Sequence, residues 1–485
     1  MIQFTMMLLT FIAAGNIPPV YGDSNPIPPR EKYLLLDSRI IEKVDGVILK
    51  VGTVAKHSKN PLFKEDKPWE VRIDNVYANV IWEPSENVYK CWYNPFIMDK
   101  AVANTPPDKR KTVTYIEAYK QQEEPKREMG VCYAVSYRDG IRWEKHNMYL
   151  AEYNGNKYNN IILRGPQGVG IFKDDIDPDP QRRYKMFFKD PTTNTLSVSF
   201  SRNEVSWQKP ISCPKIGVEG DTHNNAFWSP EIGKYVGITR MWSGENKYEG
   251  VRQVGRTESS DFIHWTQAKV ILEGLEPHLQ TYAMPVFRYA DIYLGLVMIF
   301  DTKADRVHCE LTWSPDTYTW YRIDPGTPLI PNSEKEGDYD WGCVYAGAYP
   351  IFLENEIRLY YGGSNGPHTN WRESGLCLAT LRPDGFAGYE VEKENETAVI
   401  TTKPLICSGK NLAITADVEC GGSVIAIVID DKGASRITGV PITNTVTDGA
   451  VQWEGGGDLS EFMNKSIRLK IEIKDAKVYS VGFVK

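Results

Sequence analysis

Hydrophobic and polar positions alternate along this chain in short runs, and turn-forming residues separate the runs. One pattern recurs: an alternating run, a turn containing Asp, Asn or Gly, and then an aromatic residue with a polar tail. Its copies are YAVSYRDGIRWEK (Trp143), VSFSRNEVSWQK (Trp207), VGRTESSDFIHWTQ (Trp265), CELTWSPDTYTWYR (Trp320) and CLATLRPDGFAGYE (Tyr389). Because apolar alternation flanks a turn in each copy, each one predicts a β-hairpin.

A second pattern precedes every copy of the first: a strand, an acidic or Gly/Asn turn, and another aromatic strand. Its copies are NVIWEPSENVYKCWY, GIFKDDIDPDPQRRYKMFF, AFWSPEIGKYVGITR, PVFRYADIYLGLVMIF and YPIFLENEIRLYYGG. Two hairpins per period make four antiparallel strands, so we expect a five-bladed β-propeller over residues 31–390. Independent domains of about 60 residues are the alternative, but they would be marginal alone, whereas neighbouring blades bury one another's faces.

The two ends of the chain carry different patterns. Residues 397–485 contain short alternating runs between Gly- and Asp-rich turns, which predict a C-terminal β-sandwich. Residues 1–22 are expected to be a signal peptide, because an uncharged apolar run is followed by Val20, Tyr21 and Gly22. A buried first strand or helix is the alternative. We therefore expect a protein that is secreted or periplasmic, with no membrane span.

Composition narrows the function classes. The formal net charge of the 485 residues is −7 and there is no long basic run, which disfavours nucleic acid as a partner. Aromatic residues make up 12% of the chain, as suits many short strands. The eight cysteines are scattered without a CxxC pair, so we expect them in the core and predict neither a metal site nor a cofactor.

Candidate chemistry lies where the first strand of each blade begins, because these strands line the central channel and their leading ends converge at one mouth. Catalytic candidates at these positions are Asp74, Asp221 and Asp340. Substrate-binding candidates beside them are Asn75, His223, Asn224, Gln280, Tyr282 and Trp341, together with His368, Trp371 and Arg372 from a Gly-rich loop of the fifth blade. Trp stacks on sugar rings, while Arg and His donate hydrogen bonds to hydroxyls or carboxylates.

Clustered carboxylates are the groups that glycosidic-bond cleavage requires. One protonated acid donates to the leaving oxygen, and one ionised group activates water or attacks the anomeric carbon. Repulsion between the two carboxyls raises one pKa and leaves the other low. The alternative is that an Asp at a strand start is a turn residue that accepts backbone hydrogen bonds.

The chain resembles the five-bladed propeller glycosidases of glycoside hydrolase families 32 and 43, and within them an atypical bacterial group described as family 32-like. The segments that carry the resemblance are RIDNVYANVIWEP, FKDDIDPDPQRRYKMF, DTHNNAFW, YAMPVF and YYGGSNGPH. The resemblance implies that Asp74 is the nucleophile or base. The family's acid is a Glu in the third blade, where this chain has Asp221, with Glu219 two residues earlier.

Two functions are therefore expected. The first is an exported glycoside hydrolase that cleaves an oligo- or polysaccharide, with Asp74 as nucleophile or base and Asp221 or Asp340 as acid. The second is a non-catalytic carbohydrate-binding propeller that has kept the cleft and lost the catalytic pair. Because both bind sugar, release of monosaccharide separates them and binding alone does not.

Overall fold

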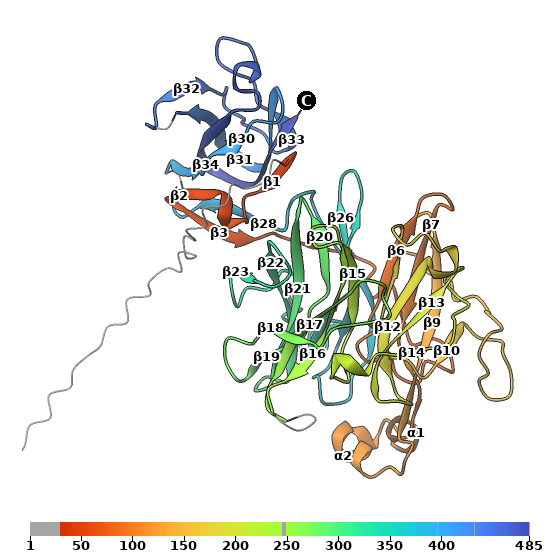
Figure 1. The fold of residues 1–485 in the computed structure, drawn as a ribbon. Helices are drawn as coiled ribbons and strands as arrows, with labels where there is room; N and C mark the ends of the chain where they lie inside the picture. Colours follow the sequence, from red (N-terminus) through yellow and green to blue (C-terminus); the bar gives the residue numbers. More distant parts are fainter. Residues whose placement is uncertain (1–29, 245–248, 395, 431, 485) are drawn as a thin grey trace, which may run out of the picture. The chain divides into compact units, whose positions relative to one another are not determined.

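The computed structural model describes residues 30–244, 249–394, 396–430 and 432–484 (Figure 1). The predicted signal peptide lies outside these residues. The described chain is built mainly of β-strands, which confirms the all-β prediction. It divides into two compact units at Ile48/Leu49 and Gly388/Tyr389. No helix among the described residues is long and apolar enough to cross a membrane.

The first sheet of the larger unit contains the first predicted repeat, with strand order β10-β9-β7-β6 and β8 paired to β9. Its strands are β6 (Asn79–Glu83), β7 (Val88–Tyr93), β8 (Phe96–Asp99), β9 (Arg127–Tyr137) and β10 (Ile161–Arg164). Between β8 and β9 the chain forms α1 (Lys100–Asn104) and α2 (Tyr115–Lys120), which project beyond the sheets at the bottom of Figure 1. Asp99 caps α1 and Thr114 caps α2.

The second and third sheets each have four antiparallel strands in sequence order, as two consecutive hairpins predict. The second contains β11 (Gln167–Lys173), β12 (Tyr184–Asp190), β13 (Thr195–Ser201) and β14 (Ile211–Ser212). The third contains β15 (Asn225–Ser229), β16 (Lys234–Trp242), β17 (Arg252–Ser259) and β18 (Lys269–Leu272).

The last two predicted repeats share one sheet instead of forming two, because β22 and β24 meet in a single parallel pair, Val307 with Cys343. The strands are β19 (Leu279–Ala283), β20 (Val286–Tyr289), β21 (Ile292–Asp301), β22 (Arg306–Ser314), β23 (Tyr321–Ile323), β24 (Cys343–Ala346), β25 (Ile351–Phe352), β26 (Ile357–Ser364) and β27 (Ser374–Leu381). Two N-terminal strands, β4 (Ala55–Lys56) and β5 (Phe63–Lys64), complete it by pairing with β27.

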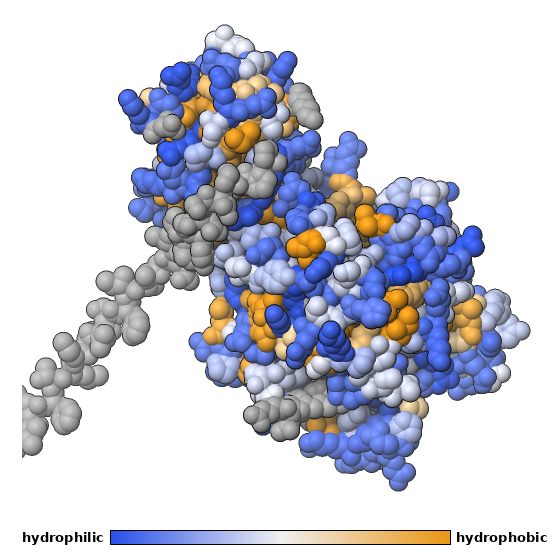
Figure 2. Space-filling model, viewed as in Figure 1, coloured by the Kyte–Doolittle hydropathy of each residue, from blue (hydrophilic) through white to orange (hydrophobic). Residues whose placement is uncertain are grey.

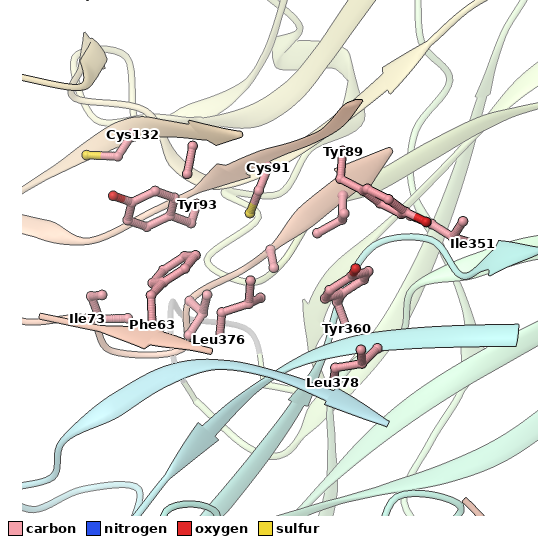
Figure 3. Packing of buried hydrophobic residues seen from close by; sticks show 14 of the residues in the cluster. Phe63, Ile73, Tyr89, Cys91, Tyr93, Cys132, Ile351, Tyr360, Leu376 and Leu378 are labelled. Atoms are coloured by element: carbon pink, nitrogen blue, oxygen red, sulfur yellow. The ribbon is translucent and has the colours of Figure 1, made fainter. Parts of the chain in front are cut away.

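Neighbouring sheets pack through aromatic clusters. Each of the four repeat tryptophans lies in a different cluster: Trp143, Trp207, Trp265 and Trp320. Figure 3 shows one of these clusters, in which Tyr89, Cys91 and Tyr93 of β7 face Tyr360 of β26 and Leu378 of β27. The first sheet therefore packs on the strands of the last predicted repeat.

The smaller unit contains strands from both ends of the chain. They are β1 (Lys32–Leu34), β2 (Ile41–Asp45), β3 (Val47–Val51), β28 (Ala387–Val391), β29 (Ala398–Thr402), β30 (Leu405–Ile406), β31 (Asn411–Ile429), β32 (Ser435–Thr438), β33 (Val446–Ala450) and β34 (Ser466–Val484). All ten belong to one sheet, in which β34 pairs with β1, β28, β29, β30 and β31. The N-terminal strands thus join the C-terminal region rather than the repeats that follow them in sequence.

Short 3₁₀ helices lie at Ser38–Ile40, Lys109–Lys111, Pro180–Arg182, Pro214–Ile216 and Ser460–Phe462. All eight cysteines lie in the described residues and none of them is in a disulfide; seven are buried, as predicted, and Cys420 is exposed. On the face drawn in Figure 2, hydrophobic residues are interspersed with hydrophilic ones.

Candidate active site

Asp74 precedes β6 and is held between two arginines. Its Oδ1 accepts a hydrogen bond from Arg372 Nη2 at 2.5 Å and lies 3.3 Å from Arg72 Nη2. Burial acts to raise the pKa of Asp74, but the charges of Arg372 and Arg72 outweigh it and hold the pKa at about 2. The side chain keeps 17% of its surface exposed, so an ionised carboxylate is accessible here.

Asn75 connects Asp74 to the opposite side of the site. Its Oδ1 accepts from Arg372 Nη2 at 2.9 Å, and its Nδ2 donates to the hydroxyls of Tyr77 at 2.8 Å and Tyr282 at 3.0 Å. The backbone turns sharply after it, because Tyr77 N donates to Asn75 O at 2.6 Å around Val76, whose φ is 63°. This γ-turn is strained for a β-branched residue, and such strain is concentrated at functional sites.

The loop between β26 and β27 supplies Arg372 and His368. The Nδ1 of His368 is 2.7 Å from the Tyr345 hydroxyl, and its ring packs on Tyr282 with centroids 4.8 Å apart. Burial and the charge of Arg372 hold the pKa of His368 well below its ordinary value, so this ring is neutral. Trp371 points to the helical insertion, where its Nε1 donates to Val113 O at 2.7 Å.

Asp221 is half-buried on the loop that leads into β15. The neighbouring Thr222 fixes this loop by donating through Oγ1 to Tyr282 O at 3.0 Å. Burial acts to lower the pKa of Arg127, but two nearby tyrosines and the carboxylates of Asp221 and Asp74 outweigh it and raise the pKa. The two predicted carboxylates therefore act on the same cation.

Three more predicted binding residues lie in the described chain, and two of them, Asn224 and Gln280, have defined hydrogen-bond partners. Asn224 is fully buried, and its Nδ2 donates to the carbonyls of Gly168 and Gly220 at 2.9 Å each, so it shapes the loop and has no donor left for a sugar. Gln280 Oε1 accepts from Arg252 Nη1 at 2.7 Å. His223 is buried against Tyr77, and neither ring nitrogen has a hydrogen-bond partner in the described chain.

Asp340 and Trp341 were also predicted to act at this site, and in the structure their contacts are with residues of the last sheet. The buried carboxylate of Asp340 binds Lys56 Nζ at 2.6 Å and the Tyr361 hydroxyl at 2.8 Å. Trp341 holds its loop through its carbonyl, which accepts from Arg306 Nε at 2.9 Å, and its ring lies under the same guanidinium. Both residues follow the predicted strand-start pattern, but their side chains serve the packing of the last sheet.

A cavity of about 460 Å³ adjoins the arginines that hold Asp74. Its lining includes Arg72, Arg372, Trp371, Arg110 and Glu65. The Oε1 of Glu65 accepts from the backbone N–H of Ile73 at 2.9 Å. Burial, opposed by hydrogen bonds from the backbone, raises the pKa of Glu65 to about 7, so this carboxyl holds its proton at mildly acidic pH.

The site also contains groups that the sequence did not single out. Four are arginines, namely Arg72, Arg127, Arg240 and Arg252, and another is Glu65. Their positions lie within a few residues of strand termini at the same end of each sheet. A search for cations at strand ends as well as carboxylates at strand starts would have found Arg127, Arg240 and Arg252, whereas Glu65 is a carboxylate that follows a strand and Arg72 lies outside the strands.

No protein-family model and no curated protein matches the sequence. Solved structures with a similar outline include a glycosyl hydrolase from Bacteroides ovatus (14% identity, 69% of this chain and 94% of that chain, TM-score 0.45). Another is a β-1,2-mannobiose phosphorylase from Listeria innocua (13% identity, 68% of this chain and 96% of that chain, TM-score 0.46). A third is a family 43 arabinoxylan arabinofuranohydrolase from Bacillus subtilis (11% identity, 89% of this chain and 99% of that chain, TM-score 0.42). At these low identities and TM-scores, they assign no role to any residue of this chain.

Proposed function

We propose that this chain is an exported glycoside hydrolase whose active site lies at one mouth of a five-bladed β-propeller. The observation that carries the proposal is the partly exposed Asp74 carboxylate, which two arginines keep ionised, while a second carboxylate, Asp221, acts on the same Arg127 guanidinium as Asp74. A pair of carboxyl groups on either side of a sugar is the arrangement that hydrolysis of a glycosidic bond requires.

The propeller is supported by the order in which the sheets pack. Successive sheets share apolar clusters along the chain, and the cluster of Figure 3 joins the first sheet to the last repeat. Such an order supports a closed ring, and a closed ring would bring the loops before β6 and β15 to one mouth. For the smaller unit we propose a β-sandwich, supported by the alternating burial along β34.

The chemistry divides between groups with different proton affinities. Asp74, with its pKa at about 2, is the nucleophile or base. The proton donor is Asp221 or Glu65: the first lies close enough to share a cation with Asp74, and the second has the raised pKa of a general acid. Arg372, with Asn75 and Tyr282 behind it, holds the Asp74 carboxylate in position through a chain of hydrogen bonds.

The test is release of reducing sugar from a panel of oligosaccharides by the full chain. We expect Asp74→Asn to lower kcat by roughly a thousandfold without loss of folding, because the ionised carboxylate acts in the transition state. Asp221→Asn and Glu65→Gln are compared in the same assay, and the variant with the larger loss of kcat identifies the donor. The exposed Asp175→Asn is the matched control and should retain wild-type turnover.

Two results would reject hydrolysis at this site. Unchanged turnover in Asp74→Asn would remove Asp74 from the mechanism. Sugar binding without release of any monosaccharide across the panel would favour the alternative, a carbohydrate-binding propeller.

A further inference from the structure

Two arginines lie together near Asp221, outside the group that holds Asp74. Arg240 is in β16 and Arg252 begins β17, and the register places both at the end of the sheet where the Asp221 loop enters β15. Their guanidinium carbons lie 4.2 and 5.6 Å from the centre of the Tyr282 ring. The two like charges therefore share one aromatic surface.

Among the described residues, this arginine pair makes no ion pair, although Asp221 acts on it from farther away. Burial acts to lower the pKa of Arg240, but Tyr282 and the Asp221 carboxylate outweigh it and raise the pKa. Arg240 is buried and donates only to neutral groups, the Tyr282 carbonyl at 2.6 and 3.2 Å and the Thr222 hydroxyl at 3.4 Å. Arg252 donates through Nη1 to the Gln280 amide, and its Nε is buried without an acceptor. In the part of the chain that the structure describes, no carboxylate lies within 4.0 Å of either guanidinium.

The absence of an ion-pair partner within the described chain affects the pKa of Arg252. Burial and the charge of Arg240 lower the pKa of Arg252 to about 10, although Tyr282 and Asp221 act in the opposite direction. Buried cations are ordinarily matched by an anion at hydrogen-bond distance, because an unpaired charge is costly to desolvate. An external oxyanion would supply the missing charge and the missing acceptors.

The pair is continuous with the proposed active site. Tyr282, which lies under both arginines, accepts through its hydroxyl from Asn75 Nδ2 at 3.0 Å, and Asn75 shares Arg372 with Asp74. Trp242 lies under the Arg252 guanidinium at 4.6 Å and adds an aromatic face. A sugar next to Asp74 could thus present a substituent to the arginine pair.

We propose that Arg240 and Arg252 form a subsite for an oxyanion carried by a sugar, either the carboxylate of a uronic acid or a sulfate ester. The inference rests on the proposed function and narrows its substrate to acidic oligosaccharides. Paired guanidinium groups match both oxyanions through parallel N–H donors, while neutral sugars leave them unpaired.

The test is calorimetric titration of the full chain with three matched ligands: a trigalacturonide, a sulfated galactose trisaccharide and neutral galactotriose. We expect at least one acidic ligand to bind tenfold or more tightly than the neutral one. Arg252→Gln should lower the affinity for the acidic ligand by a much larger factor than the affinity for galactotriose, while Arg252→Lys should restore part of the preference for the acidic ligand. Arg288→Gln, which changes an exposed arginine outside the mouth, is the control.

The acidic ligand that binds more tightly identifies the oxyanion, and either choice supports the subsite. Equal affinity for all three ligands, absence of binding, or an equal loss for acidic and neutral ligands in Arg252→Gln would overturn it. Titrations of Asp74→Asn separate this proposal from hydrolysis, because acidic preference in that variant supports the subsite even if no sugar is ever released.

Discussion

At the scale of single residues, His223 makes the stability of the protein depend on pH. Its side chain is 1% exposed and burial lowers its pKa to about 4, against nearby carbonyls that favour the protonated ring. Between pH 6.5 and 4 the unfolded chain binds a proton that the folded chain does not, so stability falls as the pH falls. From pH 7 to pH 5 this histidine should cost about 2 kcal/mol.

Urea unfolding of the wild type and His223→Gln at both pH values measures this cost. The stability difference between the two proteins should shrink by about 2 kcal/mol at pH 5, because the glutamine does not titrate. If the free energies of unfolding of the two proteins changed equally between pH 7 and pH 5, His223 would already be protonated, or already paired, in the folded state.

Asp74 and Asp340 show what can be predicted from the position of a carboxylate before the first strand of a repeat. Both were predicted from their position before a first strand, and Asp74 faces two arginines that line the cavity. Asp340 faces Lys56, which lies 284 residues earlier in the sequence. No local pattern contains that contact, so the turn position could be predicted from the sequence but the direction of the side chain could not.

At the scale of secondary-structure elements, the site depends on a close approach of β11 to the Asp221 loop. Gly168 has a φ of +57°, and a Cβ on it would lie 1.6 Å from Thr222 O. Gly168 O also accepts from Asn224 N at 3.0 Å. Gly168→Ala should therefore displace the loop and cost about 2 kcal/mol or more.

Gly155 is a matched control for this substitution, because its φ is +80° and a Cβ there has open space. Gly155→Ala should cost about 1 kcal/mol from backbone strain alone. Both free energies of unfolding come from urea titrations. Equal costs at the two positions would mean that the loop yields freely and that β11 does not fix Asp221.

Local alternation explains which elements the sequence revealed. The paired hairpins and their tryptophans were predictable because each is contained within about 30 residues and has a period of two. The two-residue strands β4 and β5 carry no such pattern, and their partner β27 lies far along the chain. The sequences of the N-terminal strands β1, β2 and β3 do not indicate that their partners lie in the C-terminal region.

At the scale of the larger unit, we expect closure of the proposed ring to depend on an ion pair between a half-buried lysine and a buried carboxylate. Lys56 of β4 binds Asp340 at 2.6 Å, while its strand pairs with Ala379 and Thr380 of β27. Lys56→Met leaves the Asp340 carboxylate buried without its cation, which should cost about 3 to 5 kcal/mol. Adding Asp340→Asn to that variant should recover part of the loss, because the remaining group is neutral.

Thermal and urea unfolding of the single and double variants test this closure, with Lys59→Met as an exposed control that should lie within about 0.5 kcal/mol of the wild type. A small loss in Lys56→Met would mean that water or the Tyr361 hydroxyl can replace the lysine. No recovery in the double variant would place the cost in the packing of β4 on β27 rather than in the charge. The expected recovery instead assigns Asp340 to holding the two ends of the repeat array together, which leaves Asp74, Asp221 and Glu65 as the carboxyl groups proposed for the chemistry.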